Sequence, residues 1–421
     1  MNASPVDALP FIGVLLSFAV LPGLLPRLWH RRMGTIIVLW VALYAGQSVV
    51  LAGPAVAVAG LWQAILVDYV PFMAILLALY ALGGGILVAG GPWGRPAGNV
   101  LLLIIGTLLA GIMGTIGASL LLIHPLLASN AQRFEKRHLV VAFIILVANA
   151  GGALSPLGDP PLLVGFLRGV PFFWPLTYLL VPMLMVAVPV LAVCYAIDRH
   201  LARREAPPLA QTLRLRGTLN MLLLLLLTGA ITLEGFWHPG NIRLAGAAIP
   251  GEQALATLVA GFCILLSELF TPRAIRQHNR FAWSAMREII ILFFAIFVTI
   301  APVLSLLHQV DLRQAHPALW FWLAGICSAL LDSAPTYLMF FEAAGGHAAS
   351  LVTPPSRLLS AIASGAVFFG AATYLGNAPN LMIRAIAARR GVKMPGFALY
   401  SAIACAILLP IFMIMSLTIF R

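Results

Sequence analysis

Two aspartates within otherwise apolar stretches are the residues of this sequence best suited to chemistry. Asp159 lies in the segment Asn149–Leu162, which reads NAGGALSPLGDPPL, and Asp332 begins the segment DSAPTY. A charged carboxylate at membrane depth is costly unless other groups compensate it. Burial in a medium of low dielectric constant also favours the protonated carboxyl group. We therefore expect Asp159 and Asp332 to bind Na⁺ and H⁺ in turn, both as transported ions and not as resident cofactors.

Oxygen-bearing side chains and glycines accompany both aspartates. Hydroxyl, amide and carboxylate oxygens suit a hard cation. Interrupted helices add backbone amides that bind anions and backbone carbonyls that bind cations. The candidate ion and substrate ligands are Thr115, Gly117, Ser119, Asn149, Ser155, Gly158 and Asp159 in the first half, and Asp332, Ser333, Thr336, Thr373, Gly376, Asn377 and Asn380 in the second.

Several of these polar residues also have a purely structural interpretation. Asp159 precedes two prolines and could cap the helix that they begin, and Asp332 could cap one arm of a hairpin. Asn377 and Asn380 could satisfy backbone groups that are freed where a helix unwinds. We favour a ligand role for Asp159 and the asparagines, since a capping carboxylate can also bind an ion. Both roles of Asp332 stay open.

The polar segments occur twice in the chain. The segment Gly370–Leu381, GAATYLGNAPNL, resembles the first one, and the aligned glycines Gly158 and Gly376 set the offset at 376 − 158 = 218 residues. The same offset aligns Gly114 with Asp332. Glycine and proline at this density interrupt a helix. Paired interruptions in two halves of a membrane protein indicate a midplane binding site between structural repeats.

Composition identifies the class of protein that positions these residues. The chain has 421 residues, of which 62% are hydrophobic and 9% are charged, and its mean hydropathy is +1.01. Soluble domains carry about 25% charged residues, so we predict an all-α polytopic membrane protein. The net charge of +12 does not indicate nucleic-acid binding, because the basic residues lie between apolar spans. The four cysteines are isolated, and no enzyme motif or phosphate-binding loop is present, so we expect neither a cofactor nor an enzyme.

Hydropathy and chain interruptions predict about ten spans of roughly 20 residues or more. Two further stretches, 99–130 and 316–350, have polar or glycine-rich centres and are predicted to be re-entrant hairpins. A short helix is expected at the outer interface over residues 55–66. The expected spans are 9–26, 35–53, 71–90, 139–168, 172–197, 217–235, 252–271, 288–308, 356–388 and 396–420, with 139–168 and 356–388 as broken helices.

Charge supports this topology. With the N-terminus outside, 20 of the 25 Lys and Arg residues face inward and 5 face outward, as the positive-inside rule requires. We therefore expect a bacterial inner-membrane protein with both termini on the outer side and two repeats of inverted orientation. The expected division is 1–66 as N-terminal scaffold helices, 67–197 as the first repeat, 198–216 as a cytoplasmic linker, 217–284 as linking scaffold helices and 285–421 as the second repeat.

Four segments carry a resemblance to a known family. They are Gly114–Ser119 (GTIGAS), Asn149–Trp174, Asp332–Tyr337 (DSAPTY) and Thr373–Asn380 (TYLGNAPN). With them, most of the chain resembles the bacterial sodium:proton antiporters or citrate transporters. This family belongs to the ion transporter superfamily, with the divalent anion/sodium symporters and arsenite pumps. The resemblance implies two inverted repeats, each with a hairpin and a broken helix, and a scaffold that is often dimeric.

The hairpin tips decide between branches of that superfamily. Divalent anion symporters carry Ser-Asn-Thr at each tip, whereas the tips here read Thr115-Ile116-Gly117 and Ser333-Ala334-Pro335-Thr336. This departure favours the cation-exchanging branch. We expect Na⁺/H⁺ antiport by alternating access, with residues 99–197 and 316–420 moving against the remainder. The alternatives are a Na⁺- or H⁺-coupled citrate or dicarboxylate symporter and another anion exporter of the superfamily. The expected partners are membrane lipid, a small ion or carboxylate substrate and a second copy of the chain.

Overall fold

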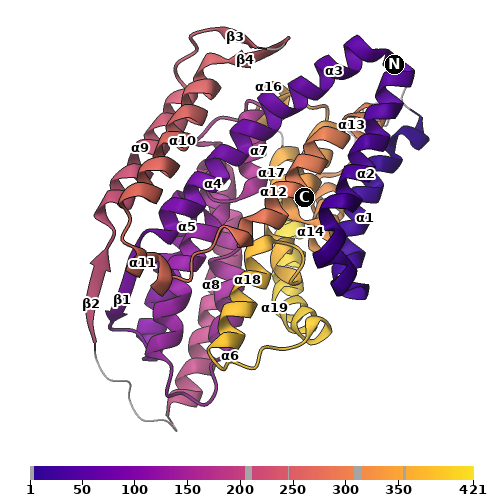
Figure 1. The fold of residues 1–421 in the computed structure, drawn as a ribbon. Coiled ribbons are helices and arrows are strands. Elements are labelled where there is room, and N and C mark those ends of the chain that lie inside the picture. The colour runs from indigo at the N-terminus through magenta and orange to yellow at the C-terminus, as the bar shows by residue number, and fades with distance from the viewer. Residues whose placement is uncertain (1–3, 204–210, 245, 308–314, 354–356) are drawn as a thin grey trace.

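Long apolar helices make up most of the chain (Figure 1). The computed structural model describes residues 4–203, 211–244, 246–307, 315–353 and 357–421. Large apolar side chains face outward along these helices, as on Val38, Leu225 and Leu258, which are 64%, 65% and 72% exposed. An outward apolar surface is what a helix in lipid requires, and the protein is an all-α polytopic membrane protein.

The first half of the chain forms eight α-helices and three short helices of other types among its described residues. They are η1 (Pro5–Ala8), α1 (Leu9–Leu24), α2 (Pro26–Ala52), α3 (Pro54–Gln63), η2 (Ala64–Tyr69), α4 (Val70–Gly84), α5 (Pro96–Ser129), α6 (Arg137–Leu146), η3 (Ala150–Leu154), α7 (Pro160–Leu167) and α8 (Trp174–Ala202).

The second half continues in the same manner within the described residues. Its helices are α9 (Thr218–Glu234), α10 (Gly251–Phe270), α11 (Arg273–His278), α12 (Ser284–Thr299), α13 (Ala301–Leu307), α14 (Pro317–Leu331), α15 (Ser333–Ala343), α16 (Ala348–Val352), α17 (Leu358–Phe368), η4 (Phe369–Ala372), α18 (Ala378–Arg389) and α19 (Phe397–Thr418).

Fewer helices than the predicted ten spans are long enough to cross a membrane. In the described part of the chain seven qualify by length and composition, or eight if α12 and α13, which are bent by 52°, count as one span. The expected span 9–26 is the 16-residue helix α1, because Leu25 and Pro26 end it. The expected span 217–235 is the 17-residue helix α9. The span 356–388, predicted as a broken helix, is divided into α17, η4 and α18, and its first residue lies outside the described residues.

The expected span 71–90 differs at both ends. Its helix ends at Gly84, because a run of three glycines follows Leu82. Residues Leu87–Gly91 then form strand β1, which pairs antiparallel with β2 (Gln211–Arg216) inside the expected linker. At its start, α4 continues directly from α3 through the π-helical turn η2, so the expected separate helix 55–66 is part of a longer one. Pro71 follows this turn and removes one backbone donor, a common cause of such local unwinding.

Both predicted hairpins fold back on themselves. The amides of Asn99 and Asn130 bond each other reciprocally at 3.0 and 2.8 Å. A continuous helix would place these residues about 46 Å apart at 1.5 Å per residue, so α5 must reverse, and it does so at Gly114. The rings of Trp320 and Phe340 are likewise 6.0 Å apart, although α14 and α15 would separate them by about 30 Å if they were collinear.

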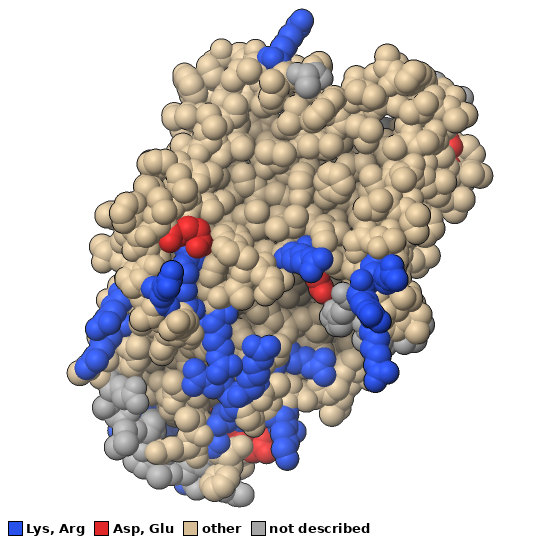
Figure 2. Space-filling model, in the orientation of Figure 1, with Lys and Arg blue, Asp and Glu red and all other residues tan. Residues whose placement is uncertain are grey.

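The two ends of the molecule differ in charge. Figure 2 shows Lys and Arg gathered over the lower half of the face drawn, which in Figure 1 carries the β1–β2 ribbon and helix α6. We call this the basic end. The hairpin of β3 (Asn241–Leu244) and β4 (Ala247–Pro250) marks the opposite end. The positive-inside rule predicts that the basic end faces the cytoplasm.

Candidate functional site

Each broken helix is fastened to its own hairpin by a hydroxyl group. The Ser155 hydroxyl donates to the carbonyl of Gly111, and the Thr373 hydroxyl donates to the carbonyl of Ala329 at 2.6 Å. In both copies the hydroxyl oxygen also accepts from the amide two residues further on, at 3.1 Å. The bonded pairs correspond at the 218-residue offset, since 373 − 155 and 329 − 111 both equal 218. The two copies therefore share the same local geometry.

The hairpin tips share a backbone conformation that favours glycine. Gly114 has φ 79° and ψ 151°, and Asp332 has φ 91° and ψ 148°. A residue with a side chain pays about 1–3 kcal/mol in such a region. Asp332 keeps its place with local bonds, because its carboxylate accepts from the Ser333 hydroxyl at 3.3 Å and the Ala334 amide at 3.5 Å. The Thr336 hydroxyl donates to the carbonyl of Asp332 at 2.8 Å.

Asp159 lies at the centre of the site and is only 1% exposed. Its Oδ1 accepts from the Thr115 hydroxyl at 3.2 Å and from the Asn377 amide at 3.1 Å. Its Oδ2 has no hydrogen-bond partner among the described residues. Although Asp159 precedes α7, its side chain makes no capping bond to that helix. The carboxylate therefore has a free oxygen for a cation or a proton.

A chain of asparagines connects the two broken helices. Asn377 donates to the Asn149 side-chain oxygen at 3.2 Å, and Asn149 donates to that of Asn380 at 2.9 Å. Asn380 also satisfies freed backbone groups, because it donates to the carbonyls of Gly370 and Thr373 at 2.8 and 2.9 Å. The asparagines thus support the unwound backbone, and Asn377 additionally reaches Asp159.

The glycines at the site permit close approach of backbone segments. A Cβ atom on Gly158 would lie 2.2 Å from the carbonyl oxygen of Gly152, and one on Gly376 would lie 2.8 Å from that of Gly370. Gly117 packs against α4, where a Cβ on Gly83 would lie 2.7 Å from its Cα.

Ser119 is the predicted ligand that lies further along the hairpin arm. It is fully buried, and its hydroxyl has no hydrogen-bond partner among the described residues. The other predicted ligands meet around the tips and the two unwound segments.

A cavity of about 160 Å³ borders the second tip. Asp332 and Asn377 line it on one side, and Phe18, Trp29 and Glu288 line it from α1, α2 and α12. The lining thus joins the second hairpin and broken helix to helices outside the predicted moving residues 99–197 and 316–420. The cavity is large enough for several water molecules at the edge of the site, since one water occupies about 30 Å³.

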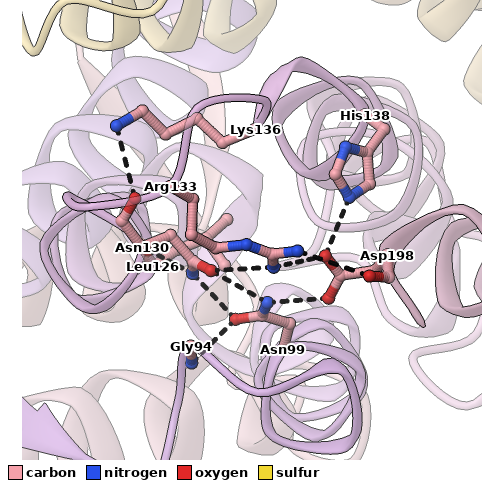
Figure 3. A network of polar contacts seen from close by, with 8 residues as sticks. All are labelled: Gly94, Asn99, Leu126, Asn130, Arg133, Lys136, His138 and Asp198. Carbon is pink, nitrogen blue, oxygen red and sulfur yellow. Dashed lines mark hydrogen bonds and ion pairs between the residues drawn. The ribbon is translucent and has the colours of Figure 1, made fainter. Parts of the chain in front are cut away.

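Sequence reasoning missed a buried charge cluster at the basic end, which Figure 3 shows from close by. Asp198, at the end of α8, is completely buried. It forms an ion pair with Arg133, accepts from Asn99 at 2.9 Å and contacts His138 Nε2 at 3.0 Å. With the pair of Asn99 and Asn130, it fastens both ends of the first hairpin to α6 and α8. The available signal was an acid directly before a basic stretch, which we assigned to the cytoplasmic linker 198–216.

Comparison with known families covers almost the whole chain. A protein-family model described as "Putative citrate transport" matches residues 2–420. The match includes both hairpins, both broken helices and every residue of the site described above. No curated protein matches the chain.

Proposed function

We propose, because the chain belongs to this citrate transport family, that it is a secondary transporter which carries citrate or a related carboxylate together with Na⁺ or H⁺. The family description favours this substrate over the Na⁺/H⁺ antiport that we expected first. The observation that carries the proposal is the position of Asp159. Beside the N-terminus of α7, its Oδ1 accepts from a residue of each half, Thr115 and Asn377. Its Oδ2 has no hydrogen-bond partner among the described residues.

The anionic carboxylate and the coupled cation require different partners in the site. A helix N-terminus carries a positive partial charge, which favours a carboxylate group at the starts of α7 and α18. This attraction acts through the helix dipole, because Pro160, Pro161 and Pro379 have no amide hydrogen to donate. Asp159 and Asp332 would repel that anion unless each holds Na⁺ or H⁺. Coupled entry of cation and carboxylate follows from this electrostatic requirement. Hydroxyls of Thr115 and Ser333 would complete the cation shell.

The site elements are connected well enough to move as one body. Ser155 and Thr373 bind each broken helix to its hairpin, and the asparagine chain binds the broken helices to each other. We propose that this body, residues 99–197 and 316–420, moves against the scaffold during alternating access. We further propose a dimeric scaffold in the bacterial inner membrane, with both termini outside.

Na⁺/H⁺ antiport is retained as the second candidate function. The observation that favours it is the set of side chains bonded to Asp159, which in the described part of the chain are one hydroxyl and one amide. Such a shell suits Na⁺ or a proton without any anionic substrate.

Reconstitution in liposomes separates the two candidates. Labelled citrate uptake that follows an imposed Na⁺ or pH gradient is the expected result. A pH dye inside the same vesicles reports Na⁺-driven proton movement in the absence of citrate. Proton movement of that kind without any citrate uptake would overturn the first proposal in favour of antiport.

A further inference from the structure

A second cavity, of about 320 Å³, lies at the opposite end of the molecule. It is bounded by η2, the end of α7, the end of α9 and the start of α10. Three carboxylates line it, from Asp68, Glu234 and Glu252. His238, which also lines it, contacts Glu252 at 3.2 Å. The lining is therefore negative whenever this histidine is neutral.

Two oxygen atoms in the lining lack hydrogen-bond partners among the described residues. One is Oε1 of Gln253, a side chain that is only 4% exposed. The amide nitrogen of Gln253 donates to the carbonyl of Val67 at 2.8 Å, so its oxygen is presented without a donor. The other is Oε2 of Glu234. Buried oxygens without a donor are unfavourable, and a cation in the cavity is a partner that suits such an oxygen.

Asp68 connects this cavity to an ion-paired arginine. Arg168 Nη2 lies 3.3 Å from Asp68 Oδ1, and its Nη1 lies 3.0 Å from Glu342 Oε1. Arg168 directly follows α7, nine residues after Asp159, which places it about 13 Å further along the helix axis. Asp68 lies outside the predicted moving residues 99–197 and 316–420, whereas Arg168 and Glu342 lie within them. The Arg168–Asp68 pair thus crosses the boundary between them.

We propose that this cavity is a binding site for a hard metal cation, and that the bound cation competes with Arg168 for the carboxylate of Asp68. No group of three His, Cys, Asp or Glu residues in the described chain is arranged to enclose a metal, so the bound ion keeps much of its water. A cation at Asp68 weakens the pair that joins scaffold and moving body. Only this last consequence rests on the proposed transport function; the binding itself does not.

Terbium luminescence tests the site in the full-length protein in detergent. Trp237 is 45% exposed and adjoins His238 of the cavity, so it is placed to sensitise Tb³⁺. We expect a saturable luminescence signal that falls when Na⁺ or Mg²⁺ displaces Tb³⁺. Separate titrations with Na⁺ and with Mg²⁺ identify the ion that the site prefers. Glu234→Gln and Gln253→Ala should each weaken Tb³⁺ binding about tenfold, because ligand charge and number set cation affinity.

Further variants separate the parts of the proposal. Arg168→Gln should strengthen Tb³⁺ binding several-fold, since Asp68 loses its competitor. If Glu234→Gln does not fold, Glu252→Gln serves as a second test, because Glu252 is partly exposed and removing its charge should also weaken Tb³⁺ binding. Glu135→Gln is the matched control, because Glu135 is an exposed carboxylate at the basic end whose pKa is lowered by its bond to Arg137. It should leave Tb³⁺ binding unchanged.

Failure of the proposed cation site and failure of the proposed transport function give different results. Asp159→Asn should lose transport and keep the Tb³⁺ signal. A wild-type protein that binds Tb³⁺ but moves no citrate would overturn only the proposed function. Unchanged Tb³⁺ affinity in the Glu234, Glu252 and Gln253 variants, or no displacement of Tb³⁺ by Na⁺ or Mg²⁺, would overturn the proposed cation site. Unchanged affinity in Arg168→Gln would overturn the competition for Asp68.

Discussion

The two halves of the site have the same backbone but place their acids differently. Gly114 in the first tip corresponds to Asp332 in the second, and Asp159 in the first broken helix corresponds to Asn377 in the second. Asp159 is buried and is held by residues of both halves. Asp332 lines a cavity, and among the described residues its carboxylate bonds only within its own tip. The comparison teaches that two segments with the same backbone geometry can place their acids differently, one buried between the halves and one beside a cavity.

The largest expected effect comes from the inner acid. Asp159→Asn should reduce coupled flux in liposomes more than about 100-fold, because a neutral amide cannot hold the cation that offsets the anionic substrate. The double variant Asp159→Asn with Asn377→Asp moves the carboxylate to the corresponding position in the other half. The two side chains are neighbours, since Asn377 Nδ2 lies 3.1 Å from Asp159 Oδ1. Partial recovery of flux is expected. Wild-type flux in the single variant would show that the carboxylate has no part in coupling.

The bases of the two hairpins offer a second comparison. The first is held by the buried cluster of Asp198, Arg133 and His138, and the second by packing of Trp320 on Phe340. Asp198→Asn should lower the free energy of unfolding by about 3–5 kcal/mol, because Arg133 loses its buried partner. Denaturant titration in detergent measures this change. The control Glu135→Gln removes an exposed ion pair and should cost less than about 1 kcal/mol.

Exchanging the tip residues tests whether strain at Asp332 serves function. Asp332→Gly should raise the free energy of unfolding by about 1 kcal/mol, since glycine adopts the tip conformation freely, while transport falls. Gly114→Ala should lower it by about 1–3 kcal/mol for the converse reason. Asp332→Ala is the control that loses the carboxylate but keeps the strain. Full transport by Asp332→Gly would reduce this residue to a structural role.

The smallest effects are expected at the paired hydroxyls. Ser155→Ala and Thr373→Val each remove the hydrogen bond to a hairpin carbonyl and the bonds that the hydroxyl accepts from nearby amides. Each variant should lower the free energy of unfolding by about 0.5–1.5 kcal/mol for each bond lost. Ser155→Thr and Thr373→Ser retain the hydroxyl and serve as controls, with little change in thermal unfolding temperature. Similar losses in both copies are expected, and a large difference between them would break the correspondence of the two halves.

Local composition was enough to predict where two of the helices are interrupted. Glycine and proline at Asn149–Leu162 and Gly370–Leu381 cannot continue a helix, and the apolar runs around them could only lie in a membrane. The 218-residue offset, the hairpin tips and the acids at Asp159 and Asp332 could all be identified in this way. The number and limits of the spans could not, because a π turn and a strand pair replaced expected helix ends.

Tertiary structure alone decided which groups meet. Asp159 and Asn377 are 218 residues apart, and Asn149 and Asn380 are 231 apart, so no local pattern records their contacts. The Asp198 cluster and the acidic cavity likewise assemble from several elements that pack only in the folded chain. Helix interruption depends on a few neighbouring residues, whereas a binding site depends on the packing of the whole bundle. Sequence by itself therefore determined the breaks and the candidate acids, and folding determined their partners.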